Sequence, residues 1–239
     1  MKLVQWEKLQ NTGLITMVGG ENRHNPEFLE AMLGALDEIE ADKSIKAVVI
    51  ESSDPKFWSL GIDLNWMMGI MGNPEQHGDI RKFLYRLNDL FKRLLTYPMP
   101  VIAAMGGHAF GDGSIMACAC DFRLMRTDRG FFCFPEVDIN IPFLPGMMAI
   151  VRNAVPTPAL QKMVLSGARI GGEELMSMGV VVETADSPEQ LHEKALALAA
   201  TFDKNRGVFG ELKTRMHKHI LAAIQDEDPA YIEPLQLLA

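Results

Sequence analysis

The segment 106–115, GGHAFGDGSI, constrains the fold more than any other part of this chain, because its four glycines separate two short apolar runs. The run at 101–105 predicts a strand, and the apolar residues from 115 onward predict a helix. The first N–H groups of a helix have no partner within it, so a glycine turn before a helix presents donors to an anion. The segment therefore predicts a strand, a turn that binds a negatively charged oxygen, and a helix.

Strand-like and helical segments alternate along roughly the first 145 residues. The expected strands are 4–6, 14–18, 47–51, 101–105, 122–125, 131–134 and 180–183. The runs at 47 and 101 are continuously apolar, which is typical of strands covered on both faces. A helix is expected after the N-cap Asn25 and Pro26. The other expected helices are 80–94, 146–154, 158–165, 172–178, 188–203 and 208–225. This order predicts an α/β core followed by added helices.

The net charge of −8 argues against a nucleic-acid or anionic-membrane partner. No stretch approaches the ~18 apolar residues of a membrane-spanning helix, and no targeting signal is visible, so we expect a soluble cytoplasmic protein. The three cysteines, Cys118, Cys120 and Cys133, lack metal-ligand spacing. We expect them to be reduced thiols in the core, with no metal site.

A second loop of the same kind, SLGIDL at 59–64, follows the strand that ends near 51 and leads into another apolar run. Gly61 permits a tight turn, and Asp63 is well placed to cap the following helix. One such loop is weak evidence for a site. Two of them, about 50 residues apart, could supply one N–H group each to a single oxygen.

The two loops resemble the paired oxyanion-hole segments of the crotonase (enoyl-CoA hydratase/isomerase) superfamily. Ser59, Gly61, Asp63 and Leu64 match the pattern Ser/Ala-x-Gly-x-Asp-Leu, and 107–113 resembles Gly-x-Ala-x-Gly-Gly-Gly. The similarity continues through the segments FPEV at 134–137 and IPF at 141–143. It covers most of the chain, with its segments in the family's order.

This resemblance implies a spiral of ββα repeats in residues 1–187 and a helical trimerisation region in 188–239, in a homotrimer or a dimer of trimers. It also implies an acyl-CoA thioester as substrate, with no cofactor beyond the coenzyme A that the substrate carries. The N–H groups of Ile62 and Asp112 would hold the thioester oxygen as it becomes an enolate. Further substrate contacts are expected from Ser59, Leu60, Gly61, Asp63, Leu64, Gly111, Lys56 and Arg23, with Arg23 and the adjacent His24 near the nucleotide.

Hydratases of this family use two glutamates, and this chain matches one of them. Ile115 stands at the first position and Glu136 at the second. Addition of water needs both groups, whereas one base is sufficient to carry a proton from C2 to C4 of a 3-enoyl-CoA. The Δ3-Δ2-enoyl-CoA isomerases resemble this chain in both positions. Apolar neighbours of Glu136, such as Phe134 and Ile139, are expected to raise its basicity.

Asp112 stands where the family usually has glycine or alanine. An ionised carboxylate about 4 Å from the enolate would oppose it by roughly 4 kcal/mol at an effective dielectric near 20. One interpretation is that the side chain points away and caps the helix begun near Gly113. Another is that Asp112 is a second acid, as an enoyl-CoA hydratase or a thioester hydrolase would need. A non-catalytic relative that binds CoA esters is the remaining alternative.

Overall fold

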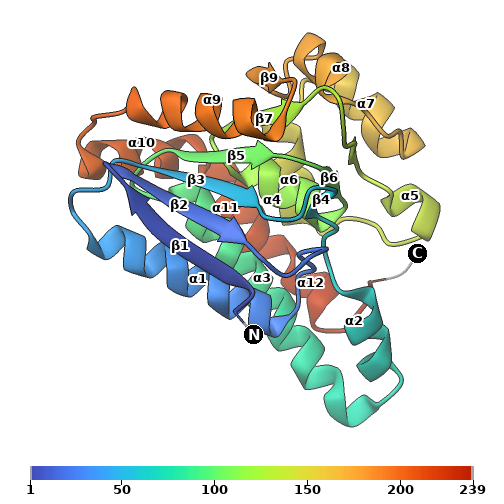
Figure 1. Ribbon diagram of the computed structural model, residues 1–239. Coiled ribbons are helices and arrows are strands. Elements are labelled where there is room, and N and C mark those ends of the chain that lie inside the picture. The colour runs from blue at the N-terminus through green and yellow to red at the C-terminus, as the bar shows by residue number, and fades with distance from the viewer. Residues whose placement is uncertain (1, 238–239) are drawn as a thin grey trace.

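The computed structural model describes residues 2–237 and has a mixed α/β architecture (Figure 1). Its main sheet contains six strands in the order β1-β2-β3-β5-β7-β9. β1 and β2 are antiparallel, and the other neighbours are parallel. The strands are Val4–Leu9 (β1), Thr12–Met17 (β2), Ala47–Ser52 (β3), Val101–Met105 (β5), Phe122–Arg126 (β7) and Glu183–Ala185 (β9).

Three short strands form a second, parallel sheet in the order β4-β6-β8. They are Phe57–Ser59 (β4), His108–Phe110 (β6) and Phe132–Cys133 (β8). Each follows a strand of the main sheet and leads into a helix, so the chain repeats a ββα unit as the predicted spiral requires. Because β4 and β6 are parallel neighbours, the loops that follow them leave the same edge of the small sheet.

The helices cover the sheets and fill the C-terminal part of the chain (Figure 1). They are α1 (Pro26–Ala41), α2 (Leu64–Met71), η1 (Pro74–Gln76), α3 (His77–Thr96), α4 (Asp112–Ala119), α5 (Glu136–Ile139), α6 (Pro145–Ala154), α7 (Thr157–Ser166), α8 (Gly172–Ser177), α9 (Pro188–Ala200), α10 (Arg206–Met216), α11 (Lys218–Ala222), η2 (Ala223–Glu227) and α12 (Pro229–Ile232). As predicted, Asn25 caps α1 by accepting the N–H of Phe28 (3.0 Å). In the described part of the chain, no helix has the length and apolar character needed to span a membrane.

Both faces of the main sheet are buried at its central strands β3 and β5, as the continuous apolar runs predict. α9 packs on one face, where Leu191 and Ala195 belong to the same cluster as Val49 (Figure 1). α1, α3 and α4 form the larger core on the other face. Residues 47–50 and 101–105 are buried throughout, and the three cysteines are buried in the core as expected.

Two predicted elements differ from the structure. The strand expected at 180–183 begins only at Glu183, because the N–H of Val180 donates to Leu175 and closes the turn after α8. The helix expected at 208–225 is interrupted at His217, whose buried Nδ1 lies 2.7 Å from the carbonyl oxygen of Leu95. The division between residues 187 and 188 falls directly before α9 and stays a prediction.

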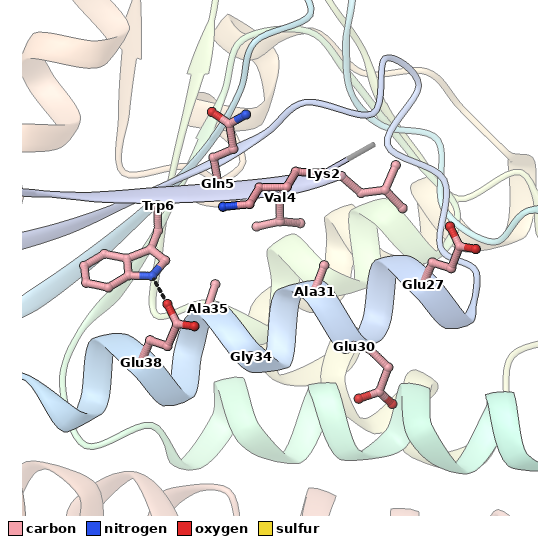
Figure 2. A pocket seen from close by; sticks show the side chains of 11 residues that line it. Lys2, Val4, Gln5, Trp6, Glu27, Glu30, Ala31, Gly34, Ala35 and Glu38 are labelled. Atoms are coloured by element: carbon pink, nitrogen blue, oxygen red, sulfur yellow. Dashed lines mark hydrogen bonds between the residues drawn. The ribbon is translucent and has the colours of Figure 1, made fainter.

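A surface groove of about 830 Å³ lies between β1 and α1 (Figure 2). Trp6 lines it from the strand, and its indole N–H donates to Glu38 of the helix (2.6 Å). Glu27 and Glu30 add two more carboxylates from α1. No residue of either glycine loop lines this groove, so it is separate from the predicted site.

Candidate active site

The two glycine loops are in direct contact at the ends of β4 and β6. Phe57 and Ser59 pair with His108 and Ala109, which brings the loops side by side. Gly61 has a φ of +72°, and a Cβ at this position would lie 2.7 Å from the amide nitrogen of Asp112. Only glycine therefore allows the two loops to approach so closely.

Two backbone N–H groups at this contact remain available to a ligand. In the described part of the chain, neither the Ile62 amide nor the Asp112 amide donates a hydrogen bond. The backbone groups on either side of the Ile62 amide form hydrogen bonds instead. The N–H of His24 donates to the carbonyl oxygen of Gly61 (2.7 Å), and the N–H of Asp63 donates to the carbonyl oxygen of His24 (2.9 Å). Asp112 is the first residue of α4, where the helix dipole also favours negative charge.

These amides adjoin a mostly apolar cavity of about 270 Å³. Among the residues that line it, Arg23, Asp112 and Glu136 are the ones with ionisable side chains. Arg23 also donates to Glu21 (2.7 Å). The apolar lining comes largely from α2, the loop before α6 and Leu237 near the C-terminus. Such a cavity suits an apolar ligand with one polar group fixed by a few donors.

Glu136 is the first residue of α5 and faces the second glycine loop. A Cβ added at Gly111 would lie 3.2 Å from Glu136 Oε1. The φ of Gly111 is +55°, a conformation that favours glycine. Glu136 Oε2 is inaccessible and has no hydrogen-bond partner within the described residues. Burial raises the pKa of Glu136 to about 8, and the nearby Asp112 carboxylate acts in the same direction. A carboxylate with this pKa is well suited to accept a proton near neutral pH.

The cavity has no second carboxylate at the position of Ile115. This side chain projects from α4 into the cavity lining and is 1% exposed. It can contribute packing against a substrate but no proton transfer. Glu136 and the aliphatic Ile115 thus line the same cavity.

The side chain of Asp112 is turned towards His24, which corrects the predicted helix cap. α4 begins at Asp112 itself, its N-cap residue is Gly111, and no side chain caps it. Asp112 Oδ2 instead forms a hydrogen bond with His24 Nδ1, while Oδ1 has no partner among the described residues. The helix starts earlier than the sequence suggests, so Asp112 is inside the first turn rather than before it.

His24 is completely buried and is not available to a nucleotide, which corrects its predicted placement. Its ring stacks on Phe28, with centroids 4.6 Å apart, and its Nε2 lies 3.0 Å from Ser59 Oγ. The sequence pattern did not reveal that these side chains meet, because His24, Ser59 and Asp112 belong to three separated segments. The one sequence feature that could have indicated this contact is that each glycine loop carries a polar residue, Ser59 in the first and Asp112 in the second.

The remaining predicted site residues divide into two groups. Leu60, Ile62, Leu64, Gly111, Asp112, Glu136 and Arg23 line the cavity. Ser59 is fully buried and does not line the cavity, and Asp63 caps α2 by accepting the N–H of Trp66 (3.1 Å). Lys56 lies over the ring of Phe57, 4.8 Å from its centroid, and is not part of the lining.

Residues 9–231 match the model of the family described as Enoyl-CoA hydratase/isomerase. The chain belongs to this family. It is 30% identical over 222 residues to enoyl-CoA delta isomerase 1, peroxisomal, of Arabidopsis thaliana, with 90% of each chain covered. It is also 31% identical over 187 residues to a probable enoyl-CoA hydratase of Bacillus subtilis, covering 75% of this chain and 70% of the relative.

The present structure has the same fold as the crystal structure of a probable enoyl-CoA hydratase of Mycobacterium tuberculosis. The two superpose with a TM-score of 0.86 over 98% of this chain and 97% of that one, at 24% identity. The predicted crotonase fold is thus confirmed. The relatives include proteins named as isomerases and proteins named as hydratases. Membership of the family therefore does not decide between these reactions, and the residues of the site must be considered.

Proposed function

We propose that this protein is a Δ3-Δ2-enoyl-CoA isomerase that uses Glu136 as its single acid–base group. The observation that supports this most directly is the pairing of Glu136, with its raised pKa, with the aliphatic Ile115 in the same cavity. The acyl part of a CoA thioester would occupy this mostly apolar cavity. The reaction requires no cofactor beyond the coenzyme A of the substrate.

The reaction begins when ionised Glu136 removes a proton from C2 of a 3-enoyl-CoA. The electron pair moves towards the thioester, and the carbonyl oxygen becomes an enolate oxygen between the amides of Ile62 and Asp112. Glu136 then returns the proton to C4, which leaves the double bond between C2 and C3. Each amide stabilises charge that develops only during the reaction, and loss of one such donor costs roughly 3–4 kcal/mol of activation free energy.

Hydration is the less favoured alternative because water addition needs a second group to orient the water or manage its proton. Asp112 is the other carboxylate at the cavity, and its Oδ2 is already bonded to His24. The same contact disfavours the thioester hydrolase alternative, in which Asp112 would act as an acid. Asp112→Gly separates these reactions, because glycine keeps the amide donor and removes the acid.

The direct test compares a 3-enoyl-CoA and a 2-enoyl-CoA as substrates for the purified protein. We expect rapid conversion of the first to the conjugated thioester and slow hydration of the second. Glu136→Gln should abolish isomerisation and leave binding of a CoA ester nearly intact. Fast hydration by the unmodified protein would refute the assignment, and absence of any turnover would favour a CoA-ester-binding role.

We also propose that the protein forms a homotrimer, or a dimer of trimers, through its C-terminal helices. α10 supports this with a stripe of large apolar side chains, Val208, Leu212 and Met216, which are 61%, 60% and 59% exposed. Residues spaced by four lie on one face of a helix. An exposed apolar face of this kind is typical of a surface that another subunit covers.

A further inference from the structure

The buried contact between His24 and Asp112 is not used by the proton transfer that we propose. His24 is fully buried, and its two ring nitrogens face Asp112 Oδ2 and Ser59 Oγ. Ser59 is also fully buried and does not line the cavity. Asp112, His24 and Ser59 are connected in the order of an Asp-His-Ser nucleophilic triad, but the buried Ser59 hydroxyl cannot reach a substrate. Their arrangement therefore requires a different explanation.

The hydrogen bonds of Ser59 determine where the protons of this cluster lie. The hydroxyl has one proton, and it donates this proton to the carbonyl oxygen of Asn22 (2.8 Å). Ser59 Oγ accepts the N–H of Gly61 (3.1 Å), so its contact with His24 Nε2 requires the ring to donate. His24 therefore carries a proton on Nε2.

The contact between His24 Nδ1 and Asp112 Oδ2 then needs a second proton. If this proton is on the ring, the pair is an imidazolium beside a carboxylate; if it is on Asp112, both groups are neutral. The pair has no net charge in either case. A compensated charge is also what burial demands, because Asp112 Oδ1 has no partner and the described residues place no lysine or arginine against Asp112.

The position of Asp112 makes this charge compensation important for the oxyanion site, which is the pair of Ile62 and Asp112 amides that would hold the enolate oxygen. Only its own Cα, Cβ and Cγ separate the amide that faces the cavity from the carboxylate oxygens. An uncompensated charge about 6 Å from the enolate would slow its formation roughly 100-fold at an effective dielectric near 20. The backbone of His24 also holds the first glycine loop through its bonds with Gly61 and Asp63.

We propose that His24 is a positioning residue of the oxyanion site, which holds both glycine loops and neutralises Asp112 so that its amide can serve the enolate. This inference rests on the proposed isomerase function. His24 acts through Asp112 and does not touch the substrate. Its contribution is therefore expected in kcat more than in KM, because the substrate carbonyl carries no full charge before the reaction.

The test begins with His24→Asn, which leaves Asp112 without its partner. We expect kcat for a 3-enoyl-CoA to fall about 100-fold while KM changes less than about threefold. Adding Asp112→Asn to this variant removes the charge and should recover at least about tenfold of the lost kcat. A double variant no more active than His24→Asn would overturn the proposal. His219→Asn, which changes an exposed histidine, is the matched control and should retain the original kcat.

A second measurement counts the protons without any substrate. Nitrogen-15 NMR of the unmodified protein should show Nε2 of His24 protonated, with the ring signal assigned through its correlations to the backbone of His24. An unprotonated Nε2 would refute the inference, even if the variant fails to fold. Failure of the unmodified protein to isomerise a 3-enoyl-CoA would refute the proposed function instead, and the NMR result would still decide the state of the pair.

Discussion

Replacing Glu136 by Gln should make the protein more stable at alkaline pH, although it removes the proposed base. In the unfolded chain this carboxyl ionises near its ordinary pKa of 4.5, whereas in the folded protein burial raises its pKa to about 8. Between these values the unfolded state binds fewer protons than the folded state, so stability falls as pH rises. Below pH 4.5 both states are protonated, and above pH 8 both are ionised. The glutamine variant lacks this dependence.

The structure sets the size of the effect. A pKa difference of about 3.5 corresponds to about 5 kcal/mol of unfolding free energy at 1.36 kcal/mol per unit. Glu136 is only half-buried as a residue, and it lines the cavity. We therefore expect a smaller gain, about 2–4 kcal/mol, for Glu136→Gln relative to the unmodified protein between pH 5 and pH 9.

Urea unfolding of both proteins at pH 5, 7 and 9 measures this difference directly. Glu193→Gln, which changes an exposed glutamate in the middle of α9, is the matched control and should show no comparable trend. Equal stability changes at pH 5 and pH 9 for Glu136→Gln would refute the reasoning. The raised pKa also predicts that kcat of the unmodified enzyme rises with pH, is half-maximal near pH 8 and levels off above it, because the base must be ionised.

Three further substitutions probe other parts of the site and the assembly. Gly61→Ala should lower kcat at least about 100-fold, because its Cβ would meet the amide of Asp112 at 2.7 Å; normal turnover would show that the loops can separate. Ile115→Glu places a second carboxylate in the cavity and should raise the hydration rate of a 2-enoyl-CoA above that of the unmodified protein, at a stability cost of about 3 kcal/mol. A rate no higher than before would count against Ile115 as the residue that excludes hydration. Leu212→Glu should shift the assembly to monomers in light scattering, and an unchanged mass would exclude the α10 stripe from the interface.

The sequence alone was sufficient for the features that depend on neighbouring residues. The glycine loops, the cap formed by Asp63 and the start of α1 at Pro26 follow from turn and capping preferences that operate over a few positions. The two buried central strands follow in the same way from continuous apolar runs. Glu136 and Ile115 came from the resemblance to a family, and the fold that this resemblance implies is confirmed.

Tertiary structure decided the features that depend on segments far apart in the chain. His24 and Asp112 are separated by 88 positions, so no local pattern indicates that their side chains meet. Leu237 reaches the cavity, although it lies far from the glycine loops in sequence. The orientation of Asp112 was open in the sequence because both a cap and an acid were compatible with its position. Packing against His24 resolved it, since a buried carboxylate is stable only where another group supplies a proton or a positive charge.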